Sequence, residues 1–362
     1  MQIKHLLLAL TAGLFAAACS DDDTPAPDPV NPYYPDAVST VYVLNQGSQG
    51  SIDGSLDALS LTSEIYTSGL FLQQNKQSLG DSPQQAMAYG SKLYVAVFGS
   101  NLVWVLDKHT ARIVKSITVE APEGLAMHGG YVYVAENTGK VARIDTASLN
   151  LTGEITVGPN PAKMAVAGED LLVTISDGYN WENEYANGFK VARIDTKTFT
   201  KTGEIAVGMN PGKIIADPAG NAFVVCMGNY GSVAPKVWKI SEDGSAREFC
   251  DGSDIAYYEG NLYVVNNYTN WYSDPVVSVL TYKVYNAVSG AVMREDLFGE
   301  AAPALAPVFM DINPATGHIY LGTDAAAYDY TSPGYLYRYD HSGQLIKRYR
   351  TGTHPCGVAF AE

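Results

Sequence analysis

An internal repeat of about 40 residues constrains this chain more than any other feature. Three successive segments, "PQQAMAYGSKLYVAV", "PEGLAMHGGYVYVAE" and "PAKMAVAGEDLLVTI", begin at Pro83, Pro122 and Pro161, which are 39 residues apart each time. A related segment begins at Pro211, 50 residues further on, because the stretch "SDGYNWENEYANG" intervenes. Each unit holds four short apolar runs separated by turn residues, a pattern typical of one four-stranded blade of a β-propeller.

The number of units predicts an all-β, seven-bladed β-propeller over residues 37–362. We name the four strands of a blade A to D, with strand A nearest the axis. The last unit contains one strand only, and three matching runs, "VYVLNQG", "GSLDALSL" and "SEIYTSG", lie near the N-terminus. We therefore expect Thr353–Phe360 to pair with Val41–Leu44 in one blade, which closes the ring and covers both free sheet edges. The predicted A strands begin at Ser82, Ala121, Asn160, Asn210, Cys250, Pro303 and Thr353.

The N-terminal residues differ in composition from the repeats. Residues 1–18 join a weakly basic start to the apolar run "LLLALTAGLFAAA", as in a signal peptide. "FAAAC" resembles a bacterial lipobox, with Ala16 in place of the usual Leu, so Cys19 is the expected lipidation site. The acidic run Ser20–Asp23 resembles the surface-export signal of Bacteroidetes lipoproteins, and the Pro-rich residues 19–36 read as an extended tether. The alternative is a plain signal peptide followed by a chance cysteine.

Antiparallel order within each blade places the B–C loops and the D–A connections on one face of the ring. The A–B turns are short, whereas several B–C loops are long: "QGSQGSIDG", "DGYNWENEYANG", "GNYGSVAP", "NYTNWYSDP" and "DAAAYDYTSPG". These loops carry Tyr179, Trp181, Tyr185, Tyr230, Tyr268, Trp271, Tyr272, Tyr328 and Tyr330. Long loops on a rigid scaffold often carry function, although two or three of the rings are expected to serve only as the loops' own small cores.

A second set of residues ends the B strands or follows them directly. Six of the seven blades have Asn or Asp there, and we expect these side chains to ring the channel mouth: Asn45, Asn137, Asp177, Asn229, Asn267 and Asp324. The alternative for each is that Asn and Asp simply start turns. An aromatic wall over a polar ring is the composition of a ligand-binding site.

The sequence favours a binding protein over an enzyme. The formal net charge of −15 argues against a nucleic-acid partner. Of the histidines outside the signal peptide, only His354 is expected on the loop face, and it takes the repeat position of Asn160 and Asn210. No paired histidines, Cys–His arrangement or phosphate-binding loop occurs, and the spacing of Asp81 and Asp177 is not diagnostic of a cation site. We therefore predict no catalytic residue, no metal and no cofactor.

Two resemblances refine this prediction. "NPAKMAV", "LYVAV" and "VARIDT" resemble the YVTN or YncE-like repeats of surface-layer propellers. "VYVLNQGSQGSIDGSLDALSL" and "QSLGDSPQQAMAYGSKLYVAVFGSNLVWVLD" resemble the opening of a Bacteroidetes propeller-lipoprotein family that includes BtuG-type cobalamin-binding proteins. This resemblance implies an outer-membrane lipoprotein that captures vitamin B12 as a ligand and passes it to a TonB-dependent transporter. Glycan binding and a scaffold for a protein partner remain alternatives, because Trp and Tyr also stack on sugars and fill protein interfaces.

Overall fold

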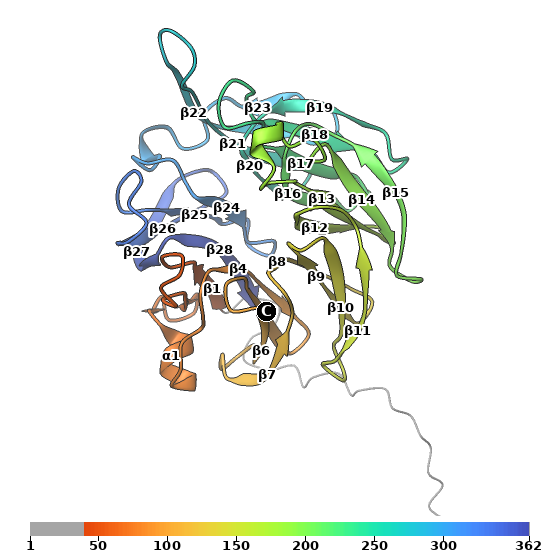
Figure 1. The fold of residues 1–362 in the computed structure, drawn as a ribbon. Helices are drawn as coiled ribbons and strands as arrows, with labels where there is room; N and C mark the ends of the chain where they lie inside the picture. Colours follow the sequence, from red (N-terminus) through yellow and green to blue (C-terminus); the bar gives the residue numbers. More distant parts are fainter. Residues whose placement is uncertain (1–39, 362) are drawn as a thin grey trace, which may run out of the picture. The chain divides into compact units, whose positions relative to one another are not determined.

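The computed structural model describes residues 40–361, and these form seven four-stranded antiparallel sheets arranged in a ring (Figure 1). The predicted seven-bladed β-propeller is thereby confirmed. The predicted signal peptide (1–18), the lipidation site Cys19 and the tether (19–36) lie outside the described residues. Within the described part of the chain, no helix is long and apolar enough to span a bilayer.

Blade 1 combines strands from both ends of the chain: β28 (Pro355–Ala361), β1 (Thr40–Asn45), β2 (Ser55–Ser60) and β3 (Tyr66–Thr67). Blade 2 consists of β4 (Pro83–Tyr89), β5 (Lys92–Val97), β6 (Leu102–Asp107) and β7 (Ile113–Thr118). Blade 3 consists of β8 (Pro122–His128), β9 (Tyr131–Glu136), β10 (Lys140–Asp145) and β11 (Leu151–Thr156). Blade 4 consists of β12 (Pro161–Ala167), β13 (Asp170–Ile175), β14 (Lys190–Asp195) and β15 (Thr200–Ala206). Blade 5 consists of β16 (Pro211–Ala216), β17 (Ala222–Cys226), β18 (Lys236–Ile240) and β19 (Ala246–Asp251). Blade 6 consists of β20 (Asp254–Tyr258), β21 (Asn261–Asn270), β22 (Val277–Asn286) and β23 (Val292–Arg294). Blade 7 consists of β24 (Phe309–Ile312), β25 (Ile319–Thr323), β26 (Pro333–Tyr339) and β27 (Leu345–Thr353). Helix α1 (Leu70–Asn75) and the 3-10 turns Trp181–Asn183 and Gly299–Ala301 complete the elements.

Strand β28 closes the ring by pairing with β1. The antiparallel register runs from Thr40 opposite Ala361 to Asn45 opposite Pro355, with a bulge near Asn45. The prediction that the C-terminal strand becomes the inner strand of the N-terminal blade is confirmed. Figure 1 shows the result as the red β1 beside the dark blue β28.

A buried carboxylate holds this closing blade together. Asp57 of β2 accepts hydrogen bonds from the Asn45 amide at 2.9 Å and the Tyr66 hydroxyl at 2.7 Å. It also accepts the backbone N–H groups of Gly69 at 2.7 Å and Gly352 at 3.2 Å. Because Gly352 belongs to β27, the contact joins blade 1 to blade 7. Hydrogen bonds to a charged group contribute about 1.5–3 kcal/mol each.

A second polar contact crosses the same seam. The Arg338 side chain is buried, and its Nη1 donates to the two Glu64 carboxylate oxygens at 2.8 and 3.0 Å. The Tyr349 hydroxyl donates to Glu64 at 3.1 Å. The hydrogen bond from Arg338 holds the pKa of Glu64 below its ordinary value. Breaking the pair would leave a buried guanidinium without its counter-charge, which is strongly destabilising.

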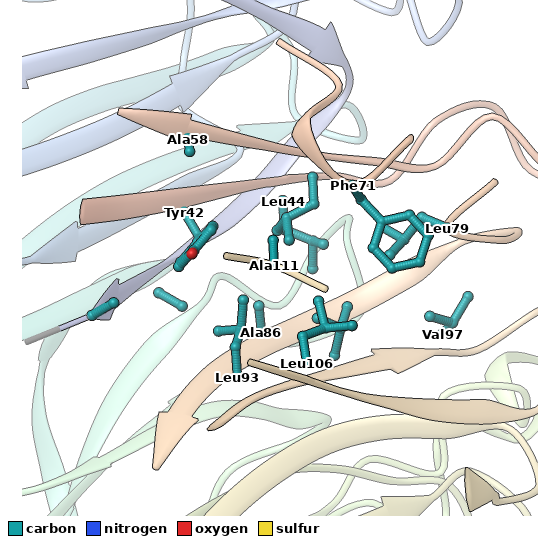
Figure 2. Packing of buried hydrophobic residues seen from close by; sticks show 14 residues of the cluster. Tyr42, Leu44, Ala58, Phe71, Leu79, Ala86, Leu93, Val97, Leu106 and Ala111 are labelled. Atoms are coloured by element: carbon teal, nitrogen blue, oxygen red, sulfur yellow. The ribbon is translucent and has the colours of Figure 1, made fainter. Parts of the chain in front are cut away.

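The apolar core lies between neighbouring blades. Figure 2 shows the cluster shared by blades 1 and 2, in which Tyr42 and Leu44 of β1 pack with Leu93 of β5 and Leu106 of β6. Phe71 of α1 covers the same cluster. All five side chains are buried, and each contributes about 1.5–3 kcal/mol to folding. Each blade is thus stabilised by its neighbours, so an open ring loses packing on two faces.

Two predicted strand starts are wrong. Cys250 lies in β19, the D strand of blade 5, where it pairs with Val237. The A strand of blade 6 begins at Asp254, and that of blade 7 begins at Phe309 instead of Pro303. Neither of these A strands begins with the proline that marks the A strands of blades 2 to 5. The repeat pattern therefore did not define where these two strands begin.

Glu136 occupies a position that is apolar in blades 2, 4 and 5. It lies opposite the first proline of its A strand, as do Val97, Ile175 and Cys226 in blades 2, 4 and 5. The Glu136 side chain is 2% exposed, and its Oε1 has no hydrogen-bond partner among residues 40–361. Burial, followed by the charge of Glu154, raises the pKa of Glu136 to about 7.

The first prediction concerns ring closure. Deleting residues from Thr353 onward should lower the melting temperature by more than 10 °C or cause aggregation, because β1 loses its pairing with β28 and the edge of β1 becomes exposed. Thermal unfolding followed by circular dichroism measures this. Deleting only Glu362 is the matched control. A truncated protein that melts like the full chain would show that β28 does not carry the closure.

The second prediction concerns Glu136. Its folded-state pKa lies above the unfolded value, so its favourable contribution is complete below about pH 4.5 and is lost as the pH rises toward 7. Glu136→Gln should therefore gain up to about 3 kcal/mol on wild type between pH 4.5 and 8. Urea unfolding across this range gives the difference, and exposed Glu300→Gln is the control. A pH-independent difference would contradict the burial argument.

Candidate functional site

The long B–C loops gather on one face, as antiparallel order requires. They span residues 46–54, 176–189, 227–235, 271–276 and 324–332. Seven of the nine predicted aromatic residues are more than half exposed on these loops: Tyr179, Trp181, Tyr230, Trp271, Tyr272, Tyr328 and Tyr330. The other two are not displayed, since Tyr185 is buried and Tyr268 is partly buried.

The loop at residues 176–189 has a small core of its own. The Asp177 carboxylate is buried and accepts hydrogen bonds from the Asn180 amide at 2.8 Å and from the Asn187 backbone N–H at 2.9 Å. Tyr185 is 5% exposed, and its backbone N–H donates to the Asn180 carbonyl at 3.0 Å. These contacts leave Tyr179 and Trp181 on the outside. Tyr185 therefore supports the loop, and its predicted contact with a ligand is not favoured by this geometry.

The stretch "NYTNWYSDP" forms a β-hairpin instead of an irregular loop. Strand β21 continues through Asn267 and Tyr268 to Asn270, and it pairs with β22 as far as Asn270 opposite Val277. Figure 1 shows this hairpin projecting from the ring. The Tyr268 hydroxyl donates to the Gly231 carbonyl at 2.6 Å, which ties the hairpin to the neighbouring loop of blade 5.

A hollow of about 420 Å³ lies on the loop face where the inner strands begin. Two predicted aromatic residues meet there, Tyr179 from blade 4 and Tyr330 from blade 7. The remaining walls are polar side chains and one further ring. The hollow is lined by Gln46, Gly47, Gln49, Ser82, Gln84, Phe98, Glu123, Tyr179, Tyr330 and His354.

The predicted polar ring does not line this hollow. Asn45 is fully buried, and its amide donates to Asp57 and Ser55. Asn137 accepts a hydrogen bond from the Asn160 amide at 2.9 Å. In both cases the polar group is used inside the propeller.

Three further members of the predicted ring, Asn229, Asn267 and Asp324, differ in their contacts. Asn229 accepts the backbone N–H groups of Gly231 and Val233, which shapes its own turn. Asn267 is exposed on the projecting hairpin, and Asp324 contacts His354. The turn-forming alternative describes two members of this set, Asp177 and Asn229, whose side chains accept backbone N–H groups of their own loops.

Four of the lining residues that sequence reasoning missed lie at the start of the A strands, and the others belong to the B–C loops of blades 1 and 2. Ser82 and His354 directly precede the proline of their A strands, and both have a left-handed backbone, with φ of 53° and 50°. Gln84 and Glu123 follow those prolines in blades 2 and 3. The signal was present in the repeat: the residues on either side of each A-strand proline begin the strand nearest the axis.

His354 is held by an acidic partner. Its Nδ1 lies 2.9 Å from Oδ1 of Asp324, and both side chains are largely buried. The Tyr330 ring meets the imidazole edge to face, with ring centres 5.4 Å apart. This arrangement fixes the orientation of the imidazole at the wall of the hollow.

Charged side chains cross-link the inner strands of neighbouring blades. Lys163 lies 3.6 Å from Glu123, and its Nζ donates to the Glu123 carbonyl at 2.8 Å. Lys213 contacts Asp254 at 2.9 Å and Asp311 at 3.1 Å, and so joins blades 5, 6 and 7. Burial alone would lower the pKa of Lys213, but the two carboxylates outweigh it and hold that pKa above its usual range.

The structure offers few groups for metal or nucleophilic chemistry. No group of three or more His, Cys, Asp or Glu among residues 40–361 is arranged to hold a metal ion. Cys226, Cys250 and Cys356 are free thiols. Burial raises the pKa of each thiol to about 12, which keeps it protonated and weakly nucleophilic at neutral pH.

Comparisons with known proteins support the fold. No family model matches the chain, and no curated protein matches its sequence. Hydrazine synthase of Kuenenia stuttgartiensis aligns with a TM-score of 0.62 at 19% identity, over 77% of this chain and 89% of that one. A quinoprotein alcohol dehydrogenase-like protein from Bacteroides thetaiotaomicron aligns with a TM-score of 0.63 at 14% identity, over 90% and 78%. The computationally designed protein Ika8 aligns with a TM-score of 0.54 at 11% identity, over 88% and 89%.

Residues 40–361 thus belong to the class of seven-bladed β-propellers. At identities below 20%, these likenesses concern the path of the backbone and not the ligand. Two of the similar structures carry enzyme names, so the fold class alone does not separate binding from catalysis.

Proposed function

We propose that this protein is a cell-surface lipoprotein that captures a corrinoid, vitamin B12, on its loop face and passes it to a TonB-dependent outer-membrane transporter. The observation that carries the proposal is the hollow between Tyr179 and Tyr330, with exposed aromatic side chains on the loops around it. The resemblance of the first two repeats to the cobalamin-binding propeller lipoproteins supplies the ligand and the partner.

The chemistry of the hollow suits such a ligand. A corrinoid is a broad disc with amide arms and a nucleotide base. The side chains of Gln46, Gln49 and Gln84 offer amide donors and acceptors for those arms. Tyr179 and Tyr330 offer flat apolar faces for the base or the ring edge.

The size of the hollow constrains the mode of binding. Ligand pockets commonly measure about 300–1,000 Å³. A volume of about 420 Å³ is too small to enclose a whole corrinoid, so we expect one part of the ligand to enter while the disc lies across the mouth. Trp181 and Trp271, both more than 60% exposed on the loop face, are further candidates for contact with the ligand.

The proposal assigns no catalytic residue. Capture needs a preformed surface, and a closed ring whose loops have internal hydrogen bonds provides one at low entropic cost. Glycan binding is the second candidate, because the exposed Trp181 and Trp271 rings are of the kind that stack on sugars. A protein partner on the same face is the third.

The third prediction tests ligand and site together. The protein lacking residues 1–36 should bind cyanocobalamin in calorimetry, and Tyr179→Ala or Tyr330→Ala should weaken binding about tenfold to a hundredfold through lost stacking. Trp181→Ala and Trp271→Ala test whether these two exposed rings also contact the ligand. His128→Ala, beside Glu169 on the other face, is the control and should bind like wild type.

Two outcomes would contradict the proposal in different ways. Absence of binding at micromolar concentration excludes the corrinoid and moves the glycan candidate forward. Binding that survives loss of both tyrosines retains the ligand and places the site elsewhere.

The fourth prediction concerns the cellular address. Cys19→Ala should abolish lipid attachment and release the protein from the outer membrane, because the thiol is the acceptor of the lipid. Labelling of intact cells with antibody, together with membrane fractionation, measures this, and Cys226→Ala is the matched control. Wild-type protein that resists both labelling and external protease on intact cells would exclude surface display.

A further inference from the structure

His354 is distinctive among its repeat equivalents. Blades 2 to 5 place Ser82, Ala121, Asn160 and Asn210 directly before the A-strand proline. All five positions share the left-handed backbone, with φ between 42° and 56°. Blade 1 alone of these has an imidazole there. The shared left-handed backbone is therefore a property of the repeat. It does not explain why blade 1 has a histidine at this position.

The partner of His354 determines which nitrogen is free. Asp324 presents a carboxylate oxygen 2.9 Å from Nδ1, and a carboxylate accepts hydrogen bonds, so Nδ1 carries the proton. In the neutral imidazole the lone pair then lies on Nε2. No residue among 40–361 forms a hydrogen bond with Nε2, and it is not sealed from solvent. His354 also lines the hollow beside Tyr330.

A histidine that donates one N–H to a carboxylate and leaves the other nitrogen free has the arrangement of a metal ligand with its outer-shell partner. A free metal ion needs several protein ligands, and residues 40–361 contain no such group. One imidazole is sufficient for a metal that arrives inside a macrocycle with a single axial position open.

We infer that His354 Nε2 coordinates the cobalt of a bound corrinoid at its open axial position. This inference rests on the proposed function. The step is a ligand substitution: the Co–OH₂ bond of aquocobalamin breaks, the Co–Nε2 bond forms and one water leaves. Cobalt(III) keeps its oxidation state, and the neutral imidazole transfers no proton because Nε2 binds through its lone pair. Asp324 acts as a positioning residue that orients the imidazole.

The fifth prediction uses two corrinoids that differ at the axial position. Wild-type protein lacking residues 1–36 should shift the visible spectrum of aquocobalamin toward that of its imidazole adduct. It should also bind aquocobalamin at least tenfold more tightly than His354→Gln does. Cyanocobalamin, whose axial position is blocked by cyanide, should bind wild type and His354→Gln within about threefold of each other by calorimetry. Added free imidazole should restore the spectral shift in His354→Ala.

The possible results distinguish coordination of cobalt by His354 from the proposed binding of a corrinoid. Binding of both corrinoids without a spectral shift in wild type overturns the inference and leaves the proposed function standing. A shift that persists in His354→Gln assigns the ligand to another residue and also overturns it. Absence of binding to either corrinoid removes the proposed function itself. If the variants fail to fold, the wild-type spectrum alone decides, since no shift is expected without axial coordination.

Discussion

Everything in this structure depends on the pairing of β28 with β1. A blade presents two apolar faces, and each is covered only when the ring is complete. The last strand joins the first blade in register from Thr40 opposite Ala361 to Asn45 opposite Pro355. The buried Asp57 and the Glu64–Arg338 pair then bind blade 1 to blade 7 across the same seam. Closure therefore combines strand pairing, apolar packing and buried polar contacts at one place. These contacts keep the ring closed, so the other six blades keep their positions around the axis.

The rigid ring allows the loops to differ. Short B–C connections in blades 2 and 3 contrast with the long ones in blades 1, 4, 5, 6 and 7, and these inserts give the loop face its asymmetry. The inserts are themselves ordered. Asp177 and Tyr185 organise one loop from within, and Tyr268 ties the projecting hairpin to the loop beside it. The exposed Tyr179 and Trp181 are consequently held on a supported surface, which reduces the conformational entropy that a ligand contact must overcome.

The fold was predictable because the repeat specifies it redundantly. Prolines 39 residues apart, alternating apolar runs and a lone terminal strand together fix blade number and closure. The predicted strand starts fail only at Cys250 and Pro303, where the marker proline is absent. The site was less predictable. Asn45 and Asp177 look like ligand contacts in the sequence, yet the Asn45 side-chain N–H groups and the Asp177 carboxylate have hydrogen-bond partners within their own blades, and such bonds leave no trace in the repeat spacing. Ser82, Gln84 and Glu123 look like ordinary strand residues, and only their place nearest the axis brings them to the hollow.

Ion pairs near the axis connect the inner strands of several blades. Lys163 and Lys213 span the inner strands of blades 3 and 4 and of blades 5 to 7 through Glu123, Asp254 and Asp311. Cross-links of this kind resist relative movement of the A strands, because separating a buried ammonium from its carboxylates exposes an unpaired charge. Glu123 also lines the hollow, so one of these cross-links fixes part of the wall of the hollow.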